Sequence, residues 1–460
     1  MNTAASLAHL NDAIVAIATA PGRGAVGIVR ASGRDLSTLI AAVCAKPLTP
    51  RVAHYGPILD AQGQALDQGL AIHFPAPNSY TGEDVLELQA HGGPVVLQLI
   101  LARCLEAGRG IGLRLANPGE FTARAFFNDK LDLAQAEAVA DLIDAGSREA
   151  ARAAMRSLQG EFSTMIQVLT GAVIDLRTHV EAAIDFPEEE VDFLADTALA
   201  ERLATVRQHF EAVTKSAGQG RLLRDGMTVV LAGAPNAGKS SLLNRLAGYD
   251  AAIVTAVPGT TRDVLRERIH VDGMPLHILD TAGLRVALDA VEEEGIRRAQ
   301  LEMARADRVL FVIDGDSDPS AQTYRDLANT LPAQVPVTLV YNKADITDTS
   351  AISAPPGVPR IDVSALTGAG LDALRSHLKS CMGYHTLESG SVSARQRHLE
   401  ALARARASVE AAAGILKETR AGELVAQELR VAQRALDEIS GEFTNEDLLG
   451  RIFSSFCIGK

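Results

Sequence analysis

The spacing of hydrophobic and polar positions changes three times along the 460 residues. In residues 1–125, short apolar runs are separated by turn residues such as Pro21-Gly22 and Pro118-Gly119. Apolar residues three to four positions apart predict a helix over Pro94–Glu106. Four apolar runs predict strands, namely Ala13–Ala18, Val26–Ala31, Gly69–Phe74 and Asp84–Ala90. This region is therefore expected to form an α+β domain.

Residues 126–220 are rich in alanine and have few helix-breaking residues. The helical spacing of their apolar positions predicts a bundle made of Leu131–Ala145, Ser147–Phe162, Met165–Ala183 and Thr197–Ser216. The acidic run Glu188–Glu190 is interpreted as a solvated helix start, because carboxylates are stabilised at the positive end of a helix. A metal site there is the less favoured alternative.

Residues 221–385 return to alternating strands and helices, which predicts a mostly parallel, doubly wound sheet. The expected strands are Met227–Ala232, Arg266–His270, Leu276–Leu279, Arg308–Ile313, Val337–Tyr341 and Arg360–Val363. Residues 386–460 are helical again. The simplest prediction is one helical domain with the α/β domain inserted into it, and two separate helical domains are the alternative.

Composition excludes some classes of protein. Apolar residues make up 47% and charged residues 22%, which excludes a mostly disordered chain. The formal charge of −13 disfavours a surface that binds phosphate everywhere, but leaves a local basic patch open. No apolar run approaches the roughly 18–20 residues needed to span a bilayer. Ala13–Ala20 is interpreted as a first strand rather than a signal peptide, since no basic residue precedes it.

The four cysteines are scattered without any CxxC spacing, which favours a reducing, cytoplasmic compartment over a disulfide framework. They are Cys44, Cys104, Cys381 and Cys457.

The segment Gly233-Ala-Pro-Asn-Ala-Gly238-Lys239-Ser240 matches the P-loop pattern GxxxxGK[ST]. It follows a predicted strand and opens the predicted helix Ser241–Ala247, which is the context that a P-loop requires. Its glycines let backbone N–H groups turn toward phosphate oxygens. Lys239 is expected to reach the β- and γ-phosphates, and Ser240 is expected to hold Mg²⁺.

Three further motifs follow, each at the end of a predicted strand. Asp280-Thr281-Ala282-Gly283 offers a carboxylate for the Mg²⁺ shell and a glycine N–H for the γ-phosphate. In Asn342-Lys343-Ala344-Asp345, the Asp345 carboxylate can accept hydrogen bonds from guanine N1–H and the N2 amine. Adenine would leave this site with unpaired polar groups. The backbone of Ser364-Ala365 can cap the base. These motifs in this order predict a Ras-like P-loop GTPase domain.

The residue after this DxxG is Leu284, which cannot orient water as the glutamine of many GTPases does. Asn236 and the segment Thr255–Asp263 are candidates to hold a monovalent cation beside the phosphates. Thr260 or Thr261 can reach Mg²⁺. Arg262 is either an arginine finger or a surface residue.

These motifs together resemble the MnmE (TrmE) family of tRNA modification GTPases, and the resemblance covers the whole chain. The residues that carry it are Asn236 in the P-loop, Gly259-Thr-Thr-Arg-Asp263, Asp280-Thr-Ala-Gly-Leu-Arg285, Cys457-Ile-Gly-Lys460, Pro21-Gly-Arg-Gly24, Pro77-Asn-Ser-Tyr-Thr-Gly-Glu-Asp84, His91-Gly-Gly-Pro94 and Asn128-Asp-Lys-Leu-Asp-Leu-Ala-Gln-Ala-Glu137.

The resemblance implies a homodimer held by an N-terminal α+β domain that binds a one-carbon tetrahydrofolate, in the 5,10-methylene or 5-formyl form. It implies an FAD-dependent partner, MnmG, in a heterotetrameric or larger complex. Together they would place an aminomethyl or carboxymethylaminomethyl group on C5 of the wobble uridine of tRNA. The folate contacts would be Arg30, Glu87, Lys130 and Lys460.

The resemblance also implies roles in the GTPase domain. The G domains would dimerise when K⁺ is held by Asn236, Thr255, Val257 and Thr260. Mg²⁺ would be held by Ser240 and Thr261, Glu292 would orient water indirectly, and Lys239 would act on the phosphates. The expected GTP contacts are Asn236, Ala237, Gly238, Lys239, Ser240, Ser241, Thr255, Thr260, Thr261, Asp280, Thr281, Ala282, Gly283, Asn342, Lys343, Asp345, Ser364 and Ala365.

The tail Cys457-Ile-Gly-Lys460 superficially resembles a prenylation box, but Gly459 is not aliphatic and Lys460 is an unusual last residue. No membrane anchor is therefore expected. Cys457 is either a catalytic thiol or a merely buried small residue.

Two further alternatives stay open. Arg395, Arg397, Arg404 and Arg406 form either a tRNA-binding patch or an ordinary solvated helix face, and the second is favoured. A regulatory GTPase in ribosome assembly, without folate chemistry, is the competing function.

Overall fold

The computed structural model describes residues 12–185, 197–247, 266–271, 274–280, 304, 306–328, 331–347, 355–382, 391–419, 421–442 and 446–459. The chain forms two compact units. The first contains Met1–Ala140, Met155–Glu211 and Glu400–Lys460, and the second contains Asp141–Ala154 and Ala212–Leu399.

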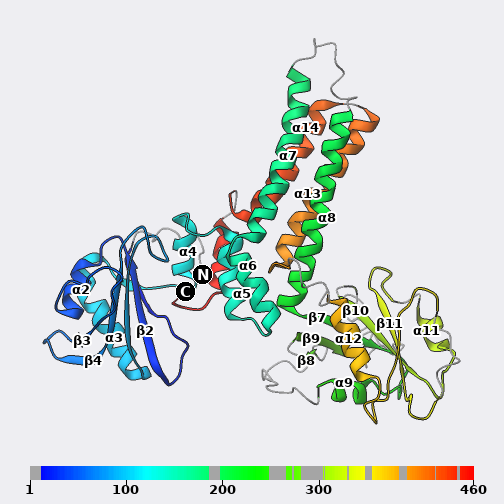
Figure 1. Ribbon diagram of the computed structural model, residues 1–460, viewed down its shortest axis with the longest axis horizontal. Helices are drawn as coiled ribbons and strands as arrows, with labels where there is room; N and C mark the ends of the chain where they lie inside the picture. Colours follow the sequence, from blue (N-terminus) through cyan, green and yellow to red (C-terminus); the bar gives the residue numbers. More distant parts are fainter. Residues whose placement is uncertain are drawn as a thin grey trace, which may run out of the picture. The chain divides into compact units, whose positions relative to one another are not determined.

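The first unit begins with a six-stranded sheet in the order β3-β4-β5-β2-β1-β6 (Figure 1). Neighbouring strands in this sheet are antiparallel, except that β1 and β6 are parallel. The strands are β1 (Ile14–Ile17), β2 (Gly24–Gly33), β3 (His54–Leu59), β4 (Ala65–Phe74), β5 (Asp84–Gly92) and β6 (Arg114–Leu115). The four predicted strands are confirmed. Strand β3 was not predicted, because it contains Gly56 and Pro57 and both residue types are depleted in strands.

Two helices pack on this sheet, α2 (Ser37–Cys44) and α3 (Pro94–Ala107), and a short 3₁₀ turn, η1 (Arg109–Ile111), follows. The predicted helix over Pro94–Glu106 is confirmed. Pro94 occupies its first turn, where a missing N–H costs nothing. A Cβ on Gly27 would lie 2.5 Å from a methyl carbon of Leu97, so the sheet and α3 approach closely at this glycine. The core between them includes Val29, Leu88 and Ile100.

The helices that follow are α4 (Glu120–Phe127), α5 (Leu133–Ile143), α6 (Arg148–Leu158), α7 (Glu161–Asp185), α8 (Thr197–Asp225), α13 (Gln396–Glu418), α14 (Gly422–Ser440) and α15 (Glu446–Ser454). Helices α7 and α14 lie side by side (Figure 1). Arg207 on α8 binds Glu410 on α13, with an Nε–Oε1 distance of 2.9 Å. Within the first unit, helices from before and after the insertion therefore pack against each other. The expectation of one helical domain, with two separate helical domains as the alternative, stays a prediction.

The second unit contains a six-stranded sheet in the order β12-β11-β10-β7-β9-β8, in which only β8 is antiparallel to its neighbour. Its strands are β7 (Met227–Ala232), β8 (Arg266–Val271), β9 (Met274–Asp280), β10 (Arg308–Asp314), β11 (Val337–Asn342) and β12 (Arg360–Asp362). Its helices are α9 (Lys239–Ala247), α11 (Gln322–Leu327) and α12 (Leu371–Cys381).

Successive residues of β7 pack into two different hydrophobic clusters of this unit. Val229 packs with Leu242 and Leu374, whereas Val230 packs with Phe311 and Tyr341. Side chains alternate between the faces of a strand, so both faces of the sheet are covered. This confirms the predicted doubly wound α/β domain.

Helix α4 spans the domain boundary that was expected between residues 125 and 126, and the boundaries themselves stay predictions. Across the described ranges, the structure contains no helix that is both long enough and apolar enough to cross a membrane.

Candidate functional site

The P-loop lies between β7 and α9 and needs glycine at two positions. Gly233 has a φ of +131°, and a Cβ there would lie 2.1 Å from the Val312 carbonyl oxygen. Gly238 has a φ of +90°, and its Cβ would lie 2.1 Å from Asn342 Nδ2. Any side chain at either position would therefore meet atoms of β10 or β11. The loop is held at the N-terminus of α9, where backbone N–H groups and the helix dipole favour phosphate.

Asn342 joins two of the predicted nucleotide motifs. It lies at the end of β11 and is 3% exposed. Its Nδ2 donates to the Ala237 carbonyl oxygen at 2.9 Å, and its Oδ1 accepts from the Ala365 N–H at 2.9 Å. One amide therefore links the P-loop to the segment expected to cap the base. Asn342 was expected as a GTP contact, and its bridging role was not predicted from the sequence.

The next residue, Lys343, has a positive φ of 65° and donates to Asp314 Oδ2 at 2.6 Å. Burial tends to raise the pKa of Asp314, but hydrogen bonds from Lys343 and Ser317 together lower it. The hydrogen bond from Lys343 to this carboxylate raises the pKa of the lysine. Asp345 is exposed and therefore accessible to a base. Asp314 was not predicted as a site residue, because its only sequence signal is an aspartate at the end of a strand.

The remaining described nucleotide residues lie at the same carboxyl edge of the sheet. Lys239 Nζ donates to the carbonyl oxygens of Gly233 and Ala234, each at 2.8 Å. Asn236 has a positive φ of 65° and is exposed, as are Ser240 and Ser241. Asp280 ends β9 opposite Leu231 of β7, which brings the start of the DxxG segment beside the P-loop. This cradle fits a nucleoside phosphate.

Several predicted residues lie outside the described ranges. They are Thr255, Val257, Thr260, Thr261, Arg262, Thr281, Ala282, Gly283, Leu284, Glu292 and Lys460. Their roles stay predictions.

The first unit brings two of the predicted folate residues into contact. Arg30 on β2 is paired in register with Glu87 on β5, and Arg30 Nε donates to Glu87 Oε1 at 2.9 Å. The guanidinium carbon lies 5.9 Å from the ring centre of Tyr80 and 5.8 Å from that of Phe121. An ion pair beside an aromatic ring is suited to a flat, hydrogen-bonding ligand such as a pterin.

The C-terminal tail is packed beside this pair. Arg30 NH1 lies 3.4 Å from the Gly459 carbonyl oxygen. Gly459 has a φ of +94°, and a Cβ there would lie 2.5 Å from the Ile17 carbonyl oxygen. Gly119 N–H donates to the Cys457 carbonyl oxygen at 3.3 Å. The Cys457 side chain is exposed, so the interpretation of this cysteine as a buried small residue is wrong.

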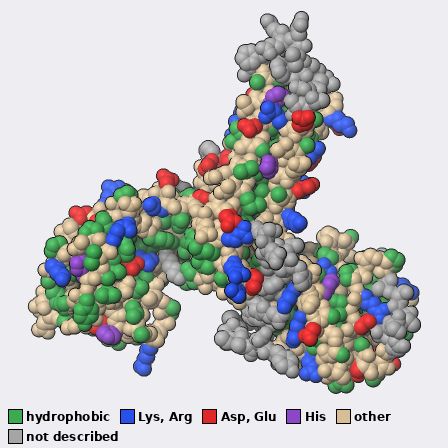
Figure 2. All heavy atoms as spheres, in the orientation of Figure 1, with side chains coloured by type: hydrophobic (Ala, Val, Ile, Leu, Met, Phe, Trp, Pro, Cys, Tyr) green, Lys and Arg blue, Asp and Glu red, His purple; other side chains and the backbone are tan. Residues whose placement is uncertain are grey.

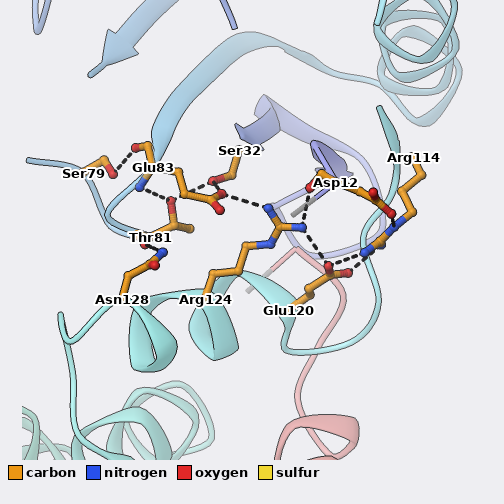
Figure 3. Close-up of polar contacts among 9 residues, drawn as sticks. All are labelled: Asp12, Ser32, Ser79, Thr81, Glu83, Arg114, Glu120, Arg124 and Asn128. Carbon is orange, nitrogen blue, oxygen red and sulfur yellow. Dashed lines mark hydrogen bonds and ion pairs between the residues drawn. The ribbon is translucent and has the colours of Figure 1, made fainter. Parts of the chain in front are cut away.

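Segment 77–84 is anchored by residues that lie in α4 or follow it. Lys130 Nζ donates to the Pro77 carbonyl oxygen at 3.1 Å, and the Tyr80 hydroxyl lies 2.8 Å from Thr122 Oγ1. Figure 3 shows Arg124 reaching from α4 to Glu83. The segment was expected as a family motif, but Arg124 was not predicted. Its only sequence signal is one charge within the mostly apolar stretch Phe121–Phe127.

The four arginines proposed as a tRNA-binding patch do not form a single exposed basic surface. They are Arg395, Arg397, Arg404 and Arg406. The Arg395 side chain is 14% exposed and binds Asp141 at 2.8 Å. Arg404 is exposed but pairs with Glu438. Figure 2 shows acidic and basic side chains interspersed along α7, α8, α13 and α14 on the face in view. The favoured interpretation of these arginines, an ordinary solvated face, therefore fits Arg404 but not Arg395.

Comparisons with known proteins match nearly the whole length of the chain. The family model of the MnmE helical domain matches residues 133–457, and that of the GTP-binding protein TrmE N-terminus matches residues 13–130. A tRNA modification GTPase MnmE from Ectopseudomonas mendocina (strain ymp) is 57% identical over 457 residues, covering 98% of this chain and 100% of the relative. Its namesake from Pseudomonas aeruginosa (strain UCBPP-PA14) is 57% identical over 454 residues, with 98% and 99% covered.

Among solved structures, the G domain of the T. maritima FeoB iron transporter is 26% identical and has a TM-score of 0.26. The match covers 34% of this chain and 98% of that one.

Proposed function

The chain belongs to the MnmE family of tRNA modification GTPases, and from this membership we propose how its two sites serve the modification of tRNA. It is an enzyme that hydrolyses GTP and acts in tRNA modification. The proposed product is an aminomethyl or carboxymethylaminomethyl group on C5 of the wobble uridine. The proposed assembly is a cytoplasmic homodimer working with the FAD-dependent MnmG.

The observation that carries the nucleotide part of this proposal is the bridge made by Asn342 between Ala237 and Ala365. It holds the P-loop and the base-capping segment at one edge of the sheet. GTP would then place its phosphates at Gly233–Lys239 and its base beside Asp345. Mg²⁺ would be held by Ser240 and Thr261 and would neutralise charge on the phosphates.

Hydrolysis is proposed to depend on K⁺, held by Asn236 together with Thr255, Val257 and Thr260, while the G domains dimerise. The exposed position of Asn236 on the P-loop supports this, and so does Leu284, which cannot position water. Glu292 would orient the water indirectly. GTP turnover is expected to be much faster in potassium than in sodium salts of equal ionic strength. Equal rates would overturn the cation site.

The one-carbon tetrahydrofolate is proposed to bind beside Arg30 and Glu87, with Lys130 and Lys460 as further contacts. The Arg30–Glu87 pair is partly exposed, with side-chain exposures of 21% and 16%, so a ligand can reach it. Glu87 can accept hydrogen bonds from pterin N–H groups, and the cations suit a glutamate tail. Cys457, exposed on the adjoining tail, is proposed as the reactive thiol.

The decisive experiment is mass spectrometry of tRNA nucleosides from cells that lack this chain. Loss of the C5-modified wobble uridine, with its return when the chain is restored, is the expected result. The Gly238→Ala variant should fail to restore the modification. The Asn244→Ala variant, which changes an exposed residue, should restore it. Unchanged modification in the deletion strain would refute the proposal and favour a regulatory role in ribosome assembly.

A further inference from the structure

Helix α4 contacts both of the segments that border the proposed one-carbon site. Toward segment 77–84, Thr122 lies beside the Tyr80 hydroxyl. Toward the tail, Gly119 at the start of the helix donates to the Cys457 carbonyl oxygen. A Cβ on Gly119 would lie 2.4 Å from the Phe453 carbonyl oxygen, so the end of α15, which leads into the tail, lies directly against this glycine. Phe121 lies under the Arg30 guanidinium.

Arg124 is the buried centre of these contacts, with 1% of its side chain exposed. Its NH1 donates to Glu83 Oε2 at 2.9 Å, and its NH2 donates to Glu120 Oε1 at 3.0 Å. The same NH2 donates to the Asp12 carbonyl oxygen at 2.6 Å. In Figure 3 the guanidinium lies between the two glutamates. One side chain therefore ties α4 to segment 77–84 and to Asp12, which lies two positions before β1.

The two glutamates do not depend on Arg124 equally. Glu120 also accepts two hydrogen bonds from Arg114, at 2.7 and 2.8 Å. Glu83 is 13% exposed, and its side chain accepts otherwise only from Ser32 Oγ, at 2.8 Å, among the contacts that the structure records for described residues. Without Arg124 the carboxylate of Glu83 would keep a partly buried charge with no cation beside it, which is costly. Segment 77–84 would move to hydrate it, whereas Glu120 would stay paired.

We propose that Arg124 is a positioning residue, which fixes Tyr80 and the C-terminal tail against α4 and so sets the geometry of the site at Arg30 and Glu87. Because the Arg124 side chain is 1% exposed, it acts through Glu83 on one side and through α4 on the other. This inference rests on the proposed one-carbon site. It adds to that site a residue that holds two distant segments in one arrangement.

The test compares Arg124→Lys and Glu83→Gln with Arg103→Lys in the full-length protein. Arg103 is the matched control, because it also makes several hydrogen bonds in the same domain, to Leu59, Ala42 and Glu106, and contacts none of the residues above. Binding of 5-formyltetrahydrofolate is measured by calorimetry. The alkylation rate of Cys457 by iodoacetamide is measured by mass spectrometry, and GTP affinity and thermal unfolding are measured in parallel.

Arg124→Lys and Glu83→Gln should each weaken folate binding by about tenfold or more. Both should also change the alkylation rate of Cys457, while GTP affinity stays as in the parent. Arg103→Lys should change neither folate binding nor alkylation, even where it lowers the melting temperature. The double variant should bind folate no more weakly than the weaker single variant, because both changes break the same contact.

Unchanged folate affinity and unchanged alkylation in folded Arg124→Lys would overturn the proposal. Equal losses in Arg103→Lys would also overturn it, since they would indicate general destabilisation. If the parent protein itself does not bind 5-formyltetrahydrofolate, the proposed ligand is wrong. The alkylation rate then still reports whether Arg124 positions the tail.

Discussion

Replacing Asn342 by alanine tests whether one buried amide organises the nucleotide site. The substitution removes the bonds to the Ala237 carbonyl oxygen and the Ala365 N–H, both 2.9 Å long. Ala237 is 1% exposed, so water cannot easily replace the lost donor. An unpaired buried polar group costs about 1–3 kcal/mol, so two of them cost about 2–4 kcal/mol after partial hydration at Ala365. If ordering the two loops around the nucleotide costs about half of this, about 1–2 kcal/mol, nucleotide affinity falls about 5- to 30-fold.

The measurement is titration of the full-length protein with a fluorescent GDP analogue, together with thermal unfolding. The matched control is Asn244→Ala, which removes an exposed amide from α9 close to the same loop. Asn342→Ala should weaken GDP binding and lower the melting temperature of the G domain, while Asn244→Ala should do neither. Parental GDP affinity and melting temperature in Asn342→Ala would refute the reasoning that this bridge organises the site.

Three other substitutions probe the sites separately. Gly233→Ala should abolish nucleotide binding, seen as no fluorescence change with GDP, because the new Cβ meets the Val312 carbonyl oxygen at 2.1 Å and φ is +131°; retained binding would contradict the tight packing of the loop. Asp345→Asn should shift preference from guanine to xanthine nucleotides in competition assays, and unchanged selectivity would remove Asp345 from the base site. Burial tends to raise the pKa of Glu120, but hydrogen bonds from Arg114 and other donors together lower it below its ordinary 4.5. Ionised Glu120 therefore stabilises the fold above pH 4.5, and this stabilisation is lost as the pH falls through the lowered pKa. The deficit of Glu120→Gln in urea unfolding should thus be largest at neutral pH and shrink below pH 4.5, and a deficit independent of pH would contradict this ion pair.

The sequence predicted most of the strands and helices because their patterns are local. A run such as Met227–Ala232 between polar turns predicts a buried strand, and the structure places β7 over the same residues. The P-loop could also be identified from the sequence, because its glycines, lysine and serine lie within eight consecutive positions. Elements without such a pattern were missed, such as β6, which has two residues and depends on its pairing with β1.

The identity of the nucleotide site also came from local motifs, but its assembly did not. Asn342 and Ala237 are separated by 105 positions and meet because β7, β10 and β11 are parallel neighbours in the sheet. A spacing rule cannot predict which amide will bridge which loops, because that depends on strand order and register. The bridge is therefore a property of the folded sheet.

The difference between what the sequence predicted and what the folded structure decided is greatest in the N-terminal domain. The sequence by itself determined the family motifs there, and with them the expectation that Arg30, Glu87, Lys130 and the tail matter together. Only the tertiary structure decided that Arg30 approaches Gly459, 429 positions away, and that Arg124 is buried between Glu83 and Glu120. The periodicity of a chain encodes which face of each element is buried, whereas the partner of a buried charge is chosen by the packing of distant segments, which no local pattern records.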